Sequence, residues 1–203
     1  MLCLSALSTI SHANTMAYDY VTSVKVNQIE LNAAIAADQV EKLIQPKLMK
    51  TTKVFVECTG NYEYSAKPSA DKTLVFEIFT EDNPQIKNAH FFQNKNNFRQ
   101  LGQTKGRIGF NWNNPKNMTE SIVVQNIPIT AQYTLQQFKH DFKHSAQVMS
   151  TSGEAQVLIL ERNQVTEFLK HPQAFTPPYT AYLNFHFKNG KLTQFAIQQA
   201  LAC

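Results

Sequence analysis

The sequence predicts an α+β protein made of two tandem βαβββ units, each an antiparallel sheet with helices packed on one face. Two observations predict this class. The chain of 203 residues repeats itself, and each copy opens with a β-rich run followed by a short helical pattern. A hydrophobic content of 43% with 17% charged residues suits a folded core. This length holds one large domain or two small ones.

The repeat places the segment from Ser23 over the segment from Ser121 without a gap. Several further pairs keep their apolar character, as Leu31 and Ile129 do. The identical pairs are Ser23/Ser121, Val26/Val124, Ile29/Ile127, Ala33/Ala131 and Gln39/Gln137. The chain is therefore expected to divide into a first unit over 20–82, a basic segment over 83–120 that holds the last strand of the first unit plus a connector, and a second unit over 121–203.

Each unit is predicted to have one helix with a recognisable start. Asp38 and Glu41 have the spacing of a capping box, which predicts a helix that starts at Asp38 and ends before Pro46. Thr134 and Gln137 have the same spacing and predict the start of the second helix.

Runs of β-type residues follow each helix and predict the strands. They cover residues 53–59 and 72–80 in the first unit, and 154–161 and 180–187 in the second. Asn189-Gly190 predicts a type I′ turn at the centre of a final hairpin, because this turn needs two positive φ angles. On the first strand of that hairpin, His186 shares a face with Tyr182 and Asn184. That face is either a partner surface or the solvent side of an edge hairpin.

Helix starts such as "YTLQQF", followed by strands that end in "F-x-F-x-N-G-x-L", resemble the fold of the β-lactamase-inhibitor proteins and of the small outer-membrane-assembly lipoproteins that share it. The resemblance covers most of the chain in element order, although its motifs are short. It implies two tandem units and binding of another protein, with no catalytic residues. The inhibitor family has a disulfide inside each unit, whereas here each half contributes one cysteine. A cystatin-like arrangement also fits the element order, but the Gln-x-Val-x-Gly loop is absent.

The N-terminal residues 1–13 are predicted to be the remnant of a signal peptide, because a short apolar run precedes Ser11-His12-Ala13. A disordered N-terminus of a cytosolic protein is the alternative. In an oxidising compartment Cys58 and Cys203 would pair, and otherwise they are two buried free thiols. No segment after the first residues is apolar for long enough to span a membrane.

The segment between the units is basic and rich in asparagine and aromatic residues. It contains no Asp or Glu between Asn83 and Thr119. Its cations are Lys87, Lys95, Arg99, Lys105, Arg107 and Lys116, and its aromatics are Phe91, Phe92, Phe98, Phe110 and Trp112. Arg and Trp concentrate binding energy at interfaces, so the predicted contact residues are Arg99, Arg107, Phe110 and Trp112. In the alternative reading, the segment supplies the last strand of the first unit and its aromatics pack inward.

The stretch "HDFKH" around Asp141 resembles the zinc-protease signature H-E-x-x-H. On a helical wheel, however, His140 and His144 lie opposite an apolar stripe, and Lys139 and Lys143 flank them. That stripe is formed by Leu135, Phe138, Phe142, Ala146 and Met149. The stretch is therefore interpreted as a solvated helix face, with His140 and His144 as weak metal candidates and a zinc hydrolase as the remote alternative.

Together these patterns predict a secreted or periplasmic module that works by binding and has no enzymatic activity or cofactor. The expected partner is another envelope or secreted protein. The alternative is an anionic ligand, such as an acidic glycan, a lipid headgroup or a nucleic acid. The formal charge of +4 is small for a nucleic-acid binder, so nucleic acid is the least favoured of these.

Overall fold

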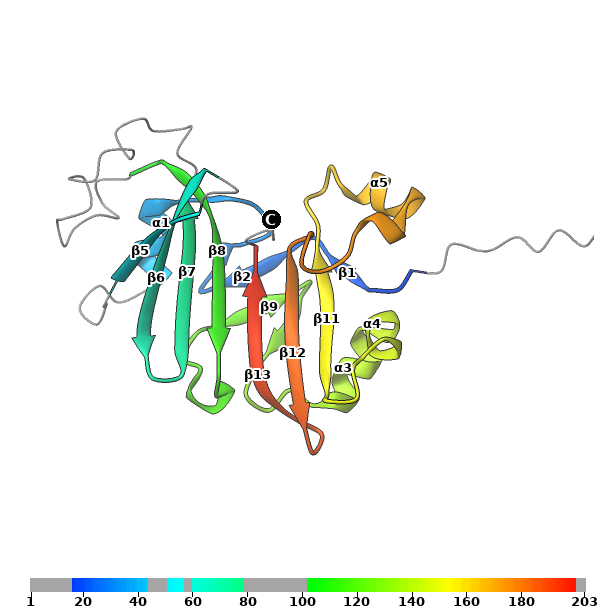
Figure 1. Cartoon of the computed structure of the whole chain (residues 1–203). Coiled ribbons are helices and arrows are strands. Elements are labelled where there is room, and N and C mark those ends of the chain that lie inside the picture. Colours follow the sequence, from blue (N-terminus) through cyan, green and yellow to red (C-terminus); the bar gives the residue numbers. More distant parts are fainter. Residues whose placement is uncertain (1–15, 44–50, 57–59, 79–101, 200–203) are drawn as a thin grey trace, which may run out of the picture.

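The computed structural model describes residues 16–43, 51–56, 60–78 and 102–199 of the chain (Figure 1). It contains sheets and helices in one mixed architecture, and the α+β prediction is confirmed. The strands are β1 (Tyr20–Val21), β2 (Val24–Val26), β3 (Ile29–Glu30), β4 (Ile35–Ala36), β5 (Thr51–Val56), β6 (Asn61–Ser69), β7 (Lys72–Ile78), β8 (Lys105–Trp112), β9 (Ile122–Val124), β10 (Ile127–Ile129), β11 (Glu154–Ile159), β12 (Tyr182–Lys188) and β13 (Lys191–Gln198). The helices are α1 (Ala37–Leu43), α3 (Leu135–Asp141), α4 (Lys143–Gln147) and α5 (Val165–Lys170), with short 3-10 turns η4 (Pro115–Asn117) and η5 (Pro172–Ala174).

One sheet of nine strands joins the two halves of the chain. Its order is β1-β11-β12-β13-β8-β7-β6-β5, with β4 beside β8. The halves meet where β13 pairs antiparallel with β8, which sets Phe195 opposite Trp112 and Ile197 opposite Phe110. Strand β8 lies in the segment 83–120 and occupies the centre of the sheet, between β7 and β13. The sheet is antiparallel except at its edge, where β1 runs parallel to β11.

A smaller sheet of four strands, ordered β10-β9-β2-β3, lies behind the large one in the view of Figure 1. It consists of two hairpins whose turns hold consecutive positive φ angles, at Asn27-Gln28 and at Gln125-Asn126. The hairpins bind each other reciprocally. The Asn27 amide donates to the Ser121 carbonyl at 2.9 Å, and the Gln125 amide donates to the Ser23 carbonyl at 2.9 Å. Both predicted β-rich openings are thus hairpins of one shared sheet.

The second helix begins as its sequence predicts. Thr134 is the N-cap, its hydroxyl accepts from the Gln137 amide, and the Gln137 side chain binds back to Thr134. The first helix differs from its prediction, because it begins at Ala37 and Asp38 lies inside its first turn. Asp38 accepts a hydrogen bond from Gln103 Nε2 at 2.8 Å there. A carboxylate in a first turn is still favourable near the positive end of the helix dipole.

Helix α3 stops at Phe142, whose backbone angles of φ −130° and ψ 73° leave the helical region, and α4 follows at once. Asp19 binds the start of α4, since its carboxylate accepts from the Ser145 amide at 2.9 Å and its own amide donates to Ser145 Oγ at 2.9 Å. The predicted apolar stripe remains on the core side through this break. Phe138 and Phe142 are buried, and Leu135, Ala146 and Met149 pack against the same core.

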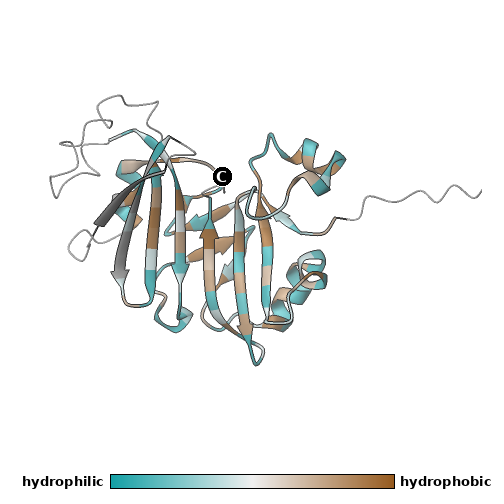
Figure 2. Cartoon of the chain, in the orientation of Figure 1, coloured by the Kyte–Doolittle hydropathy of each residue, from teal (hydrophilic) through white to brown (hydrophobic). Residues whose placement is uncertain are grey.

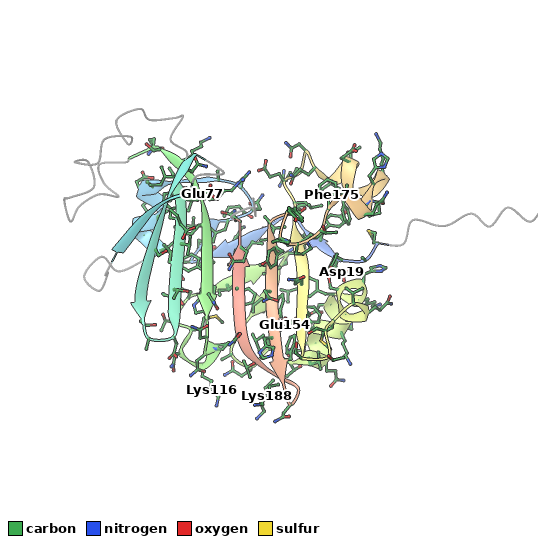
Figure 3. The ribbon with its side chains drawn as sticks, in the orientation of Figure 1. Asp19, Glu77, Lys116, Glu154, Phe175 and Lys188 are labelled. Carbon is green, nitrogen blue, oxygen red and sulfur yellow. The ribbon has the colours of Figure 1, made fainter. Side chains whose placement is uncertain are left out.

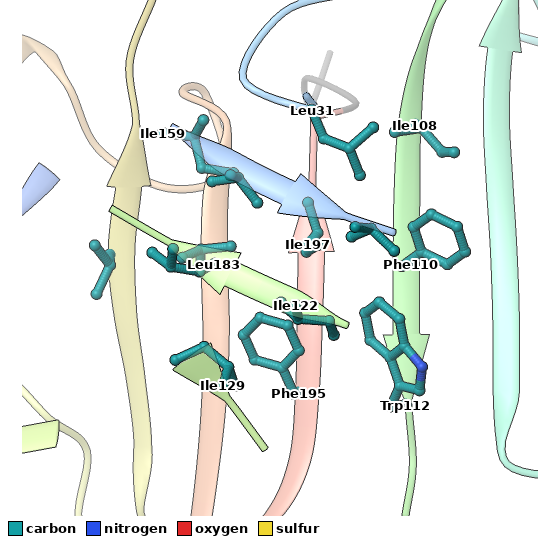
Figure 4. Close-up of a cluster of buried hydrophobic side chains, with 14 of the residues drawn as sticks. Leu31, Ile108, Phe110, Trp112, Ile122, Ile129, Ile159, Leu183, Phe195 and Ile197 are labelled. Carbon is teal, nitrogen blue, oxygen red and sulfur yellow. The ribbon is translucent and has the colours of Figure 1, made fainter. Parts of the chain in front are cut away.

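The main core fills the space between the two sheets, and α1, α3 and α4 complete its cover. Figure 4 shows Trp112, Phe110 and Phe195 of the large sheet together with Ile122 and Ile129 of the small one. Each fully buried side chain of this size contributes about 1.5–3 kcal/mol of transfer free energy. The alternation along the strands, with brown and teal residues in turn in Figure 2, separates this inner face from the outer face.

Helix α5 departs from the prediction that helices cover one face. It packs on the outer side of the large sheet, near the β11 edge, where Phe168 joins Leu158 and Leu160 in a second, smaller core. Leu158 has the opposite parity to Val157 and Ile159, which belong to the main core. Its outward apolar side chain requires a cover, and α5 with η5 provides it. None of the described helices is long and apolar enough to cross a membrane.

A buried amide locks the end of β13 to the first half. Gln199 is 3% exposed, and its Oε1 accepts from the Ile108 amide at 2.8 Å. Its Nε2 donates to the carbonyls of Leu31 and, at 3.0 Å, Ala33. One side chain therefore ties the second half to β8 and to the loop before β4, and fixes the loop's backbone.

A second buried cluster, at the other end of β8, joins β7, β8 and the segment before β9. Glu120 binds Lys72 Nζ through one oxygen and Trp112 Nε1, at 3.0 Å, through the other. The side chains of Lys72 and Glu120 are 13% and 5% exposed. Burial alone would raise the pKa of Glu120, but the bonds from Lys72 and Trp112 outweigh it and hold that pKa below the usual 4.5.

We expect the Glu120 cluster to make folding stability depend on pH. Because the folded pKa is lowered, the carboxylate's stabilisation is complete above about pH 4.5 and is lost as the pH falls through the folded pKa. Urea unfolding between pH 7 and pH 3 measures this loss, and Glu120→Gln is the control. The slope of stability against pH should be shallower in Glu120→Gln than in the parent chain. Identical slopes would contradict the assignment.

Candidate binding surface

The outer face of the large sheet is an open surface in the described part of the chain. No described helix or strand lies over its middle in Figure 1, because the small sheet, α1, α3 and α4 are on the other side. The strand register places its residues in rows that cross the sheet. One row consists of Thr73, Asn111, Ala196, Asn184 and Gln156, from β7 to β11. A shorter row beside it consists of Gln194, His186 and Glu154.

Four of the eight residues in these rows are carboxamides: Asn111, Asn184 and Gln156 are half-buried, and Gln194 is exposed. Gln198, in the row of Gly109 and Tyr182, adds a fifth half-buried amide to the same face. Asn184 Oδ1 is enclosed by its neighbours and has no hydrogen-bond partner. Each amide carries both donors and acceptors, so such a row can match peptide groups of either polarity. The surface is thus rich in neutral hydrogen-bonding groups.

The residues at the centre of this face have small side chains. Gly109 lies between the two halves, and an added Cβ would meet Gln198 Oε1 at 3.1 Å. Ala196 of β13, which lies in the next row opposite Asn111, is also small. Tyr182 stands in the row of Gln198, and burial together with the Glu154 carboxylate raises the pKa of Tyr182. Its hydroxyl therefore remains a neutral donor at pH 7.

His186 lies on an interior strand, because β12 is paired by β11 on one side and β13 on the other, so the final hairpin is not at an edge of the sheet. The imidazole is held by its neighbours. Its Nε2 lies 3.1 Å from the Ser152 carbonyl oxygen, and its Nδ1 lies 3.1 Å from Thr193 Oγ1. His186 is therefore a fixed part of the outer face (Glu154, its partner across the strands, is labelled in Figure 3).

Two of the four predicted contact residues are corrected by the structure. Phe110 and Trp112 are each 1% exposed and stack on each other with ring centroids 5.1 Å apart. They point to the inner face because β8 alternates, so they form part of the core and no partner reaches them. The inward-packing alternative is the right one for these two aromatics. Arg99 lies outside the described residues, as do Phe91, Phe92 and Phe98.

Arg107, the remaining predicted contact, is half-buried on the outer side of β8, opposite the buried Glu77 of β7. The described cations of the basic segment do not form one patch. Lys105 and Arg107 lie near the start of β8, whereas Lys116 follows its other end in η4. Eight strand residues separate these ends by roughly 25 Å.

The "HDFKH" stretch forms a local hydrogen-bonded group. Asp141 accepts from the Tyr133 hydroxyl at 2.9 Å, and its other oxygen lies 2.9 Å from His140 Nδ1. Burial raises the pKa of Tyr133, and the bond to Asp141 raises it further. Among the residues that the structure describes, no three His, Cys, Asp or Glu side chains gather as a metal site would require, and this includes His140 and His144. Cys58 and Cys203 lie outside the described residues.

Comparisons with protein-family models, curated proteins and solved structures return no match to this chain. The resemblance to the β-lactamase-inhibitor fold therefore remains a prediction.

Proposed function

We propose that this chain is a non-enzymatic binding module, secreted or periplasmic, that holds a protein partner on the outer face of its large sheet. The observation that carries the proposal is the row of carboxamides that the register aligns across β8, β12 and β11. The strand register spaces these amides regularly across the sheet. A partner that offers peptide groups at matching positions loses little conformational entropy on binding.

The dimensions and charge of the face support a protein partner. Five strands spaced by about 4.8 Å, each six to eight residues long, give a flat area of roughly 400–500 Å². A standard interface buries about 800 Å² on each partner, so this face supplies the centre and the neighbouring loops supply the rim. Arg107 is accompanied on this side by Glu63, Glu77 and Glu154. A polyanion would need a stripe of one sign, which the described part of this face does not present.

Removing three outer-face amides tests the proposal. The parent chain from Asn14 is immobilised and used to capture proteins from an envelope extract, beside the variant Gln156→Ala, Asn184→Ala, Gln194→Ala. Each lost hydrogen bond is worth about 1 kcal/mol, so we expect capture to weaken about a hundredfold. The matched control removes three exposed amides on the helix side: Gln132→Ala, Gln136→Ala, Gln147→Ala.

The two variants separate the possible outcomes. A protein that the parent and the control capture, and that the outer-face variant loses, supports the proposal. Equal capture by all three chains contradicts it, and loss only in the control moves the interface to α3 and α4. Capture that disappears steeply as salt increases would favour the anionic-ligand alternative, because neutral amide contacts depend little on ionic strength.

A further inference from the structure

Both ring nitrogens of His186 make hydrogen bonds within the fold. Its Nε2 lies 3.1 Å from the carbonyl oxygen of Ser152, in the turn between α4 and β11. Its Nδ1 lies 3.1 Å from the hydroxyl oxygen of Thr193, on β13. The same hydroxyl donates to the backbone carbonyl of His186 at 3.0 Å. One side chain of β12 therefore connects the turn before β11 to the strand on its other side.

A β-bulge brings Thr193 to the imidazole. The pairing of β12 with β13 shifts after His186, so that His186 lies opposite Gln194 while Phe187 lies opposite Leu192. Thr193 is thus the extra residue of β13. In a regular strand Thr193 and Gln194 would point to opposite faces, but a bulge changes the direction of such a side chain. The bulge therefore places the Thr193 hydroxyl beside Nδ1.

The three contacts determine where the protons are. A carbonyl oxygen only accepts, so the Nε2 that faces Ser152 carries a proton. The hydroxyl of Thr193 has one proton, which the bond to the His186 carbonyl uses. Nδ1 must then donate to the Thr193 oxygen, so it carries a proton too. An imidazole with both nitrogens protonated is a cation, and all three hydrogen bonds therefore form together only when His186 is protonated.

A neutral His186 keeps two of the three hydrogen bonds. Ser152 offers only an acceptor, so the remaining proton stays on Nε2. The Thr193 hydroxyl then turns, donates to the bare Nδ1 and gives up its bond to the His186 carbonyl. Loss of the proton thus removes one hydrogen bond and makes the other two neutral, which weakens them.

The charged side chains near His186 have both signs. Glu154 of β11 lies opposite His186 and favours the cation. Lys188, two residues along β12, and Lys191, its partner on β13, share this face and disfavour the cation. Tyr182 is neutral at pH 7, since burial and Glu154 raise its pKa. The turn before β11 has no charged residue. These charges act in opposite directions, so the hydrogen bonds distinguish the two protonation states.

We propose that His186 is a proton sensor: the proton that it takes up in acid joins the turn before β11 to the β12–β13 bulge, and loss of this proton loosens the junction. Histidine suits this role because its charge changes between about pH 5 and pH 8. The stability that the junction contributes is fully present on the acid side of this range and decreases as the pH rises through it. The proposal does not rest on the binding of a partner.

The first test observes the imidazole directly in the parent chain. Long-range ¹H–¹⁵N correlation spectra are recorded at pH 5 and pH 8, and the signals of His186 are those that His186→Gln lacks. We expect both nitrogens to be protonated at pH 5. At pH 8 we expect the Nε2–H form, because Ser152 offers only an acceptor. The Nδ1–H form at pH 8, or a neutral ring at pH 5, would overturn the proposal.

The second test measures the contribution of the proton to stability. Thr193→Val removes the hydroxyl but keeps the shape of the side chain, so it deletes two hydrogen bonds in acid and one at pH 8. In urea unfolding we expect Thr193→Val to raise the equilibrium constant for unfolding about fivefold more at pH 5 than at pH 8. Thr193→Ser keeps the hydroxyl and should show no such difference. An equal effect of Thr193→Val at both pH values would refute the junction.

A double variant assigns the difference to this pair of residues. When His186→Gln is already present, Thr193→Val should have the same effect at pH 5 and at pH 8. The other histidines are present in every chain, so their protonation cancels in the comparison. Circular dichroism shows that each variant is folded. A difference that persists beside His186→Gln would belong to another group and contradict the proposal.

Discussion

Trp112→Ala is expected to lower the free energy of unfolding by about 3–5 kcal/mol, the usual cost of truncating a buried large aromatic. The indole is 1% exposed and stacks between Phe110 and Phe195, with ring centroids 5.1 and 5.6 Å away. Truncation also leaves Glu120 without the hydrogen bond from the indole N–H. Urea unfolding followed by circular dichroism measures the loss.

Trp112→Phe is the matched comparison for this prediction. It keeps most of the ring contacts and removes the N–H, so it should cost less than Trp112→Ala. If Trp112→Ala remained within about 1 kcal/mol of the parent, the indole would have to be a surface group, as first predicted from its segment. If the loss of stability is as large as expected, a Trp112 variant that fails to bind a partner shows damage to the core and cannot be used to map an interface.

Gly153→Ala is expected to lower the free energy of unfolding by at least about 3 kcal/mol. Gly153 has a φ of +93°, and a Cβ added there would lie 2.2 Å from the carbonyl oxygen of Phe187. That contact is with backbone, so no side chain can move aside. Relief would require breaking the pairing in which the Phe187 amide donates to the Gly153 carbonyl at 2.9 Å.

Gly190→Ala is the control that separates the strain of a positive φ from the steric clash at Gly153. Gly190 has a φ of +75° in the final turn, but nothing lies within 4 Å of an added Cβ. Its substitution should cost about 1–2 kcal/mol, for the left-handed backbone alone. Thermal and urea unfolding of both variants measure the difference. Equal losses would show that the Gly153 contact relaxes freely, contrary to this prediction.

The parts of the fold that could be predicted from sequence are those with local causes. Asn189-Gly190 forms the final turn with φ angles of +52° and +75°, because the turn type is encoded in two adjacent residues. The Thr134–Gln137 capping box and the apolar stripe of α3 and α4 are equally local. The start of α1 was misplaced by the same rule, since an Asp-x-x-Glu spacing fits a position inside the first turn as well as an N-cap.

The predictions that failed concern features that depend on the pairing of strands far apart in sequence. Phe110 and Trp112 face the core because the small sheet covers their side of β8, and no local sequence pattern predicts which side is covered. The amide rows arise from residues far apart in sequence, as Asn111 and Gln156 are, and they align only once the register of four strands is known. A pocket lined by Asn32, Arg107 and Tyr179 could not be predicted from the sequence either, because these residues come from opposite halves of the chain.

The offset that aligns Ser23 with Ser121 also relates several elements of the structure. It superimposes the bounds of β2 on those of β9 and the bounds of α1 on those of α3. It also relates the two turns at Asn27-Gln28 and Gln125-Asn126. The division into two tandem units stays a prediction. The halves still differ, since the segment between β11 and β12 holds α5 and η5.

Site-specific photo-crosslinking tests the outer-face assignment most directly. A photoreactive residue is placed at Gln194, which is exposed on the outer face, and in a separate chain at Gln147, which is exposed on α4. Each chain is irradiated with the captured partner, and the crosslinked product is identified by mass. We expect a crosslink to the partner from position 194 and none from position 147. A crosslink from position 147 with none from position 194 would contradict it.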